Sequence, residues 1–329
     1  MTLTGAVAAG GSLRHDHVVD ASASTAPAGV NVALETTTRY YTMSARVRPF
    51  LVWIQSQNVG GARLSWSRTP GEDSLVELLV GSDPARTPRG VNRWGFIAER
   101  SIGRVAELVG IMTETDDAMI DRARTERSVE TVNGRVYKTI QSVVRDGEAT
   151  STVGRLVVDD NLTYRHYRAL LQRLPGSRRT VQRMKVEPET EPGFLTAVKS
   201  LVQERLVVPE GTAGRASRNP LRRQFVYAGA TWELSLHDSG LLADVMVRQR
   251  RYGPAIQGEF KIRNMVTRKE TTFRMLYAAG AKEPGTPLRI VYRPRWWIEI
   301  ELVLVNGDEA ERALALGPST GPHVVPWQR

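Results

Sequence analysis

Hydrophobic and polar residues alternate along most of the chain from residue 39 onward, which is the period of strands with one buried face. In the first half this pattern predicts strands over 40–55, 62–67 and 75–80, separated by turns at 58–61 and 69–73. Pro49 indicates an edge, a bend or a bulge. The connections are too short for crossover helices, so we expect an antiparallel meander.

The alternation continues on both sides of the middle of the chain. A strand is predicted over 104–112, and Asp146-Gly147 between 135–144 and 150–158 is a strong hairpin signal. In the second half, apolar residues again alternate with polar ones over 232–236, 260–263, 272–277, 288–292 and 296–304. Short antiparallel strands with one polar face are typical of a curved sheet or a barrel.

Helical patterns lie between these two series of strands. Capping residues predict a surface helix over 113–128. A second helix is expected to bury one face, formed by Tyr164, Tyr167, Leu170, Leu171 and Leu174. A third begins at Glu191-Pro192 and is expected to bury an apolar stripe from Phe194 to Leu206.

These elements predict an α+β fold of predominantly antiparallel β-meanders, forming a curved sheet or a half or full barrel, with two or three helices in the middle of the chain. The expected organisation is a tail or remnant of an export signal (1–35), a meander with helices (36–207), a basic linker or excursion (208–223), an antiparallel sheet or barrel (224–310) and an irregular tail (311–329).

The first 29 residues are rich in Ala, Gly, Ser and Thr and cannot supply a core. They lack the basic start and apolar centre of a secretory signal, but Met1 could lie inside a longer one. With the β-rich body and the absence of cysteine, this favours an exported bacterial protein, periplasmic or of the cell envelope, over a cytoplasmic one. No stretch of 18 apolar residues occurs, so no transmembrane helix is predicted.

Composition and motifs exclude several kinds of chemistry. Without cysteine there is no disulfide, thiolate metal site or thiol nucleophile. The familiar phosphate-binding, hydrolase-elbow and zinc-protease motifs are also missing. His15 and His17 could pair on a metal, but their segment is expected to hold ligands poorly, and two further ligands would have to come from elsewhere. The sequence therefore predicts no cofactor, no metal and no catalytic residue.

Ser235-Leu236-His237-Asp238-Ser239 brings together the residue types of a hydrolase triad. Triads, however, are assembled from separate elements, and 238–240 has the composition of a turn. A solvated hairpin end is the favoured interpretation of this segment, and a hydrolase site near His237 is the alternative.

The net charge of +10 is concentrated in the middle of the chain. Between residues 161 and 186 there is no acidic residue, and the basic ones are Arg165, Arg168, Arg173, Arg178, Arg179, Arg183 and Lys185. Such a segment could bind nucleic acid or another polyanion in a salt-dependent way. An Arg-rich codon bias explains the same charge without any partner.

Two further segments combine tryptophan with arginine: Arg93-Trp94, and Arg293, Arg295, Trp296 and Trp297. At a barrel mouth, the rings could contact an amphiphilic ligand and the guanidinium groups could bind its anionic group. Core packing is the alternative. The leading hypothesis is a non-enzymatic β-rich protein that binds an apolar or anionic ligand in a sheet-lined concavity.

Overall fold

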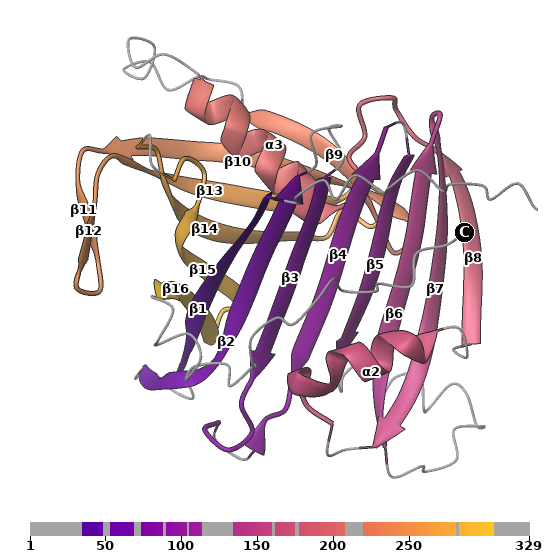
Figure 1. Ribbon diagram of the computed structural model, residues 1–329, viewed down its shortest axis with the longest axis horizontal. Helices are drawn as coiled ribbons and strands as arrows, with labels where there is room; N and C mark the ends of the chain where they lie inside the picture. Colours follow the sequence, from indigo (N-terminus) through magenta and orange to yellow (C-terminus); the bar gives the residue numbers. More distant parts are fainter. Residues whose placement is uncertain are drawn as a thin grey trace, which may run out of the picture. The chain divides into compact units, whose positions relative to one another are not determined.

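One long antiparallel sheet dominates the protein (Figure 1). The structure, a computed structural model, describes residues 35–48, 53–68, 74–87, 90–103, 105–113, 134–159, 162–174, 178–207, 220–280 and 283–305. They belong to a compact unit spanning Leu34–Arg329. Fourteen strands form the sheet in the order β8-β7-β6-β5-β4-β3-β2-β1-β16-β15-β14-β13-β10-β9.

The strands of the first half are β1 (Glu35–Val47), β2 (Ile54–Arg68), β3 (Ser74–Ser82), β4 (Trp94–Ile102), β5 (Val105–Thr113), β6 (Gly134–Arg145), β7 (Glu148–Asp159) and β8 (Arg178–Lys185). Those of the second half are β9 (Leu221–Tyr227), β10 (Ala230–Leu242), β13 (Ala255–Asn264), β14 (Glu270–Ala278), β15 (Pro287–Arg295) and β16 (Ile298–Val305). A separate ribbon pairs β11 (Val245–Val247) with β12 (Arg250–Tyr252). A 3-10 turn (Tyr164–His166) leads into α2 (Tyr167–Gln172), and α3 (Phe194–Val207) precedes β9.

Two meanders form this sheet, and the pairing of β1 with β16 joins them, with Tyr41 opposite Leu304. Strands from the ranges 36–207 and 224–310 therefore lie in one sheet. The predicted antiparallel architecture with mid-chain helices is confirmed. The Asp146-Gly147 hairpin is confirmed as well, since both residues have the positive φ angles, 49° and 77°, that such a two-residue turn requires.

Two expected turns are wrong, because the chain continues as a strand with a bulge in each place. β2 runs through 58–61, where Asn58 has a φ of 55° and the register with β1 shifts between Met43 and Ala45. A bulge absorbs extra residues without reversing the chain. Likewise β10 continues through 238–240, paired with β13, after a bulge between Leu236 and Asp238.

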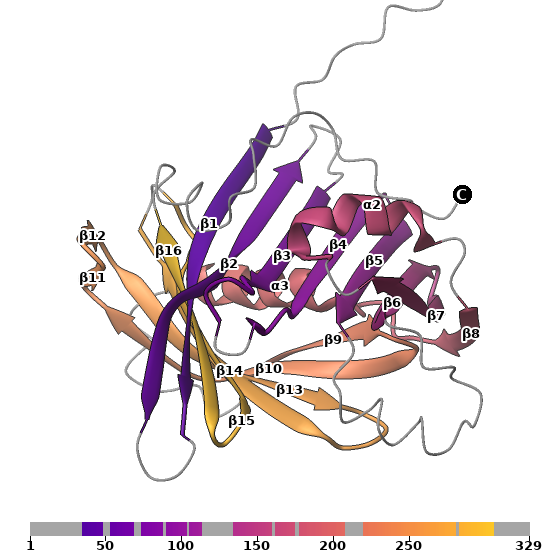
Figure 2. The ribbon, with the colours of Figure 1, turned by 90° about the horizontal axis from the view of Figure 1, so that it is seen from below.

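Each helix packs on a different face of the sheet. The predicted face of α2 and its flanking turns is confirmed, because Tyr164, Tyr167, Leu170, Leu171 and Leu174 are all buried against β3–β7. α3 buries Ala197, Leu201 and Val202 against β9, β10, β13 and β14. Figure 2 shows α3 between these strands and β2–β4, because the sheet curves around it.

Several predictions concern residues outside the described ranges, and two strands were not predicted. The helix predicted over 113–128 falls outside the described residues after Thr113, which ends β5. The tails, the His15 and His17 pair and most of 208–223 also lie outside them. The pattern did not predict β4, which carries the buried Glu99, or β8, a polar edge strand. In the part of the chain that the structure describes, no helix is long and apolar enough to cross a membrane.

Candidate ligand-binding site

The curved sheet and α3 enclose an apolar cavity of about 570 Å³, here called the α3 cavity. Its walls come from three parts of the chain, and its apolar lining includes Met43, Leu64, Trp66, Val76, Leu78, Phe194, Val198, Phe273, Met275, Ile290 and Leu302. Protein interiors are close-packed and leave few voids larger than a water molecule. A space of this size and lining is within the range of small-molecule sites.

Strand alternation explains why these side chains meet. Met43 on β1 lies opposite Leu302 on β16, which lies opposite Ile290 on β15, which in turn lies opposite Met275 on β14. Directly opposed residues in an antiparallel sheet point to the same face. The row therefore presents apolar side chains to α3 along four strands.

Among the described residues that line the α3 cavity, Lys199 of α3 is the one cation. No hydrogen bond or ion pair joins its ammonium group to another residue of the described ranges. Burial lowers the pKa of Lys199, the neighbouring Arg68 lowers it further, and Glu191 raises it. An anionic group in the cavity would therefore meet an ammonium group that has no counter-ion in direct contact in the described part of the chain.

The amino end of α3 is fixed to the sheet by Glu99 of β4. Its Oε1 accepts a hydrogen bond from the Leu195 amide at 2.8 Å, and its Oε2 accepts from the Thr196 amide at 2.7 Å and from the Thr196 hydroxyl. Burial raises the pKa of Glu99 to about 7 against the opposing effect of these hydrogen bonds. The contacts set the position of α3, and hence of Lys199, one turn further along the helix.

Arg93 and Trp94 of the sequence prediction lie at the start of β4. Trp94 is 4% exposed in the core beneath α2, and its indole donates to the Tyr137 hydroxyl at 3.1 Å. Arg93 is exposed. Neither residue lines the α3 cavity.

Arg293 and Arg295 lie at the end of β15, and Trp296 and Trp297 form the turn to β16, with Trp296 74% exposed and Trp297 41% exposed. Arg293 forms an ion pair with Glu299 at 2.5 Å. Strands β3, β2 and β1 separate β4 from β16, so the structure does not bring the two Trp/Arg segments together.

The basic segment is divided between two elements. Arg165, Arg168 and Arg173 are exposed in and beside α2, whereas Arg178, Arg179, Arg183 and Lys185 lie on the edge strand β8. Arg183 is opposite Thr150 of β7, and by alternation it shares the sheet face on which α2 packs. Basic residues on an edge strand also oppose pairing with other chains.

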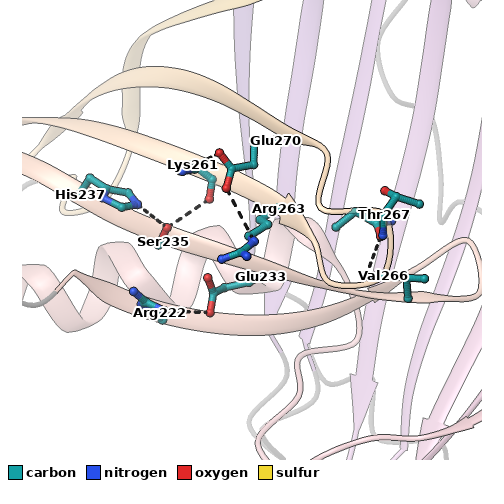
Figure 3. A network of polar contacts seen from close by, with 10 residues as sticks. Arg222, Glu233, Ser235, His237, Lys261, Arg263, Val266, Thr267 and Glu270 are labelled. Atoms are coloured by element: carbon teal, nitrogen blue, oxygen red, sulfur yellow. Dashed lines mark hydrogen bonds and ion pairs between the residues drawn. The ribbon is translucent and has the colours of Figure 1, made fainter.

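Ser235 and His237 do lie in contact, with the Ser235 Oγ and His237 Nε2 atoms 2.8 Å apart (Figure 3). They belong to a polar row on the outer face of the sheet, where Arg222 pairs with Glu233 and Lys261 with Glu270. His237 is exposed, and neither residue lines the α3 cavity. Within the described ranges no cluster of three metal-ligating side chains occurs.

Sequence reasoning missed Lys199 and Glu99. It placed most of the apolar lining on the inward face of strands or on the α3 stripe, but a lysine beside such a stripe is common on surface helices. Glu99 has no sequence signal, because its role depends on α3 lying across β4. Only the absence of a nearby N-cap for α3 could have suggested a capping group from elsewhere.

Comparisons with protein-family models and with curated proteins find no match. Among solved structures, the chain is similar to a beta-barrel-like protein of domain of unknown function DUF1849 from Brucella abortus, with a TM-score of 0.32 and 7% sequence identity. The alignment covers 82% of this chain and 95% of that one.

Proposed function

We propose that this is a non-enzymatic binding protein that takes a single-chain anionic amphiphile into the α3 cavity. The observation that carries the proposal is an apolar cavity of about 570 Å³ in which Lys199 is the one cation among the described lining residues. Apolar cavities favour apolar ligands over water. The hydrocarbon chain would contact the strands, and the acidic group would pair with Lys199.

Isothermal titration calorimetry with dodecanoate and its uncharged analogue dodecanol tests both the binding of the hydrocarbon chain and the pairing of the acidic group with Lys199. We expect saturable binding of dodecanoate to the whole protein. Val198→Phe replaces a small aliphatic side chain in the cavity lining by a bulky ring and should weaken binding at least tenfold. Val207→Phe makes the same change at a position that is 81% exposed and should not weaken binding. Absence of binding, or equal binding by the two variants, would overturn the proposal.

Lys199→Met tests whether the lysine binds the acidic headgroup of the ligand. The substitution keeps a long unbranched side chain but removes the charge, so dodecanoate should bind about tenfold more weakly, in the range of a charge-assisted hydrogen bond. Dodecanol should bind equally to both proteins. If dodecanoate binding is unchanged, the cavity takes apolar chains without recognising an acid.

Polyanion or nucleic-acid binding is the second candidate. The observation in its favour is that the exposed arginines of α2 and Arg183 of β8 share one face of the sheet. This face is the opposite one from the α3 cavity, so the two proposals are independent.

A further inference from the structure

Four large apolar side chains are exposed together at one end of the sheet. Trp53 is 37% exposed, Ile54 57%, Trp296 74% and Trp297 41%. We call this set the tryptophan edge. Single exposed apolar residues are common on protein surfaces, but a group of neighbouring ones marks an interaction site.

Strand pairing holds the members of the tryptophan edge in one place. Val47, the last residue of β1, lies opposite Ile54 of β2 on one side and Ile298 of β16 on the other. The Arg48 amide then donates to the Trp297 carbonyl at 2.8 Å. The tryptophans precede Ile54 and Ile298 directly, so they lie at the same sheet end, where β1, β2, β15 and β16 meet (Figure 2).

Three arginines belong to the strand ends that carry these rings: Arg46 of β1, Arg48 directly after this strand, and Arg293 of β15. Arg46 and Arg293 share a single acid, Glu299, with ion-pair distances of 3.7 and 2.5 Å. The Arg293 guanidinium carbon also lies 6.0 Å from the centre of the Trp53 ring. The buried Nε of Arg48 has no hydrogen-bond partner among the described residues. Among the described residues, Arg46, Arg48 and Arg293 therefore carry more positive charge than Glu299 balances.

We propose that the tryptophan edge docks the protein on the surface of an anionic lipid bilayer. Tryptophan prefers the interface between lipid and water, where its ring is apolar and its N–H remains hydrated. Arginine side chains near such a surface are attracted to acidic headgroups. The four apolar side chains lie together at the ends of strands, and the excess of positive charge beside them fits a negatively charged surface.

The position of the edge relative to the α3 cavity adds a reason for such docking. Tyr292 and Ile300, which line the cavity, are opposed on β15 and β16. Tyr292 precedes the end of β15 at Arg295 by three residues, or about 10 Å at the rise of a strand. A lipid surface at the edge would therefore lie close to one end of the cavity.

Co-sedimentation with unilamellar vesicles tests the docking, using phosphatidylglycerol mixed with phosphatidylethanolamine and, for comparison, phosphatidylcholine alone. The intact protein should bind the anionic vesicles at low salt and bind the neutral ones at least tenfold more weakly. Trp296→Ser with Trp297→Ser should reduce binding at least tenfold. Arg48→Gln with Arg293→Gln should reduce both binding and its salt dependence.

Met246→Ser is the matched control, since Met246 is 67% exposed in β11. That strand follows the end of β10 that pairs with the start of β13, at the opposite end of the sheet strands from the edge. It should bind as the intact protein does. Equal binding by the Trp296/Trp297 variant would overturn the proposal, and so would binding that ignores lipid charge. Self-association in solution that this variant abolishes would assign the edge to a second copy of the chain instead. Dodecanoate titration of the Trp296/Trp297 variant separates vesicle binding from ligand binding, because this variant leaves the lining of the α3 cavity unchanged and should bind dodecanoate as the intact protein does.

Discussion

Glu99 on β4 accepts a hydrogen bond from the backbone amide of Leu195, in the first turn of α3, at 2.8 Å. These residues are far apart in the sequence, and their contact holds the helix that forms one wall of the α3 cavity. A carboxylate at a helix amino terminus is favourable, because it meets free N–H groups and the positive end of the helix dipole. Complete burial of this carboxyl group opposes its ionisation.

Glu99 should make the protein less stable as the pH rises from about 4.5 to about 7. Its pKa is about 7 in the folded protein against 4.5 for an ordinary glutamate, so the folded state binds the proton more tightly. That stabilisation is complete below about pH 4.5 and is lost as the pH rises to about 7, a change on the order of 3 kcal/mol.

Urea unfolding of the intact protein and Glu99→Gln across this pH range measures the effect. Glutamine cannot ionise, so the difference in unfolding free energy between the two proteins should change with pH in favour of the variant as the pH rises. A difference that is constant with pH would show that Glu99 titrates normally.

Gly193→Ala should destabilise the protein by about 1–3 kcal/mol through overpacking. A Cβ atom at this position would collide with the Glu99 carboxylate and lie 2.6 Å from Leu108 Cδ1. Gly240→Ala is the control, since a Cβ there meets nothing within 4 Å. Denaturant unfolding should show a clear loss for the first variant and a smaller change for the second; equal losses would contradict the packing argument.

Trp94→Phe should lower the unfolding free energy by about 1–3 kcal/mol, because the buried hydrogen bond to Tyr137 is lost together with part of the ring. Dodecanoate affinity should not change, since Trp94 packs on the α2 side of the sheet. A matching loss of affinity, measured by calorimetry at a temperature where the variant is folded, would return Trp94 to the ligand site.

Replacing Arg173, Arg178, Arg179 and Arg183 by Gln tests the basic segment on a heparin column. If these residues bind polyanions, the variant should elute at a lower salt concentration than the intact protein, because fewer counter-ions are released. Replacing Arg222 and Arg289, which pair with Glu233 and Glu301, removes charge elsewhere and serves as the control. If all the proteins elute at the same salt concentration, the arginines do not bind polyanions, and those of β8 only oppose pairing of this edge strand with other chains.

Much of the fold follows from local patterns. The alternation predicted antiparallel strands in both halves, and Asp146-Gly147 predicted its hairpin because few other residue pairs accept two positive φ angles. The apolar face from Tyr164 to Leu174 predicted the contacts of α2 correctly. Gly60 and Gly61 beside one bulge and Gly240 near the other suggested turns by composition, but pairing with neighbouring strands kept the chain extended.

The sequence by itself determined which residues alternate, and hence most of the segments that become strands and the faces that the two helices bury. Only the tertiary structure decided that β1 pairs with β16, that the sheet curves around α3, and that Lys199 faces an apolar cavity while Trp94 does not. Periodicity records the two faces of a strand but not what covers each face. That depends on strands more than two hundred residues apart, such as β1 and β16, meeting in space.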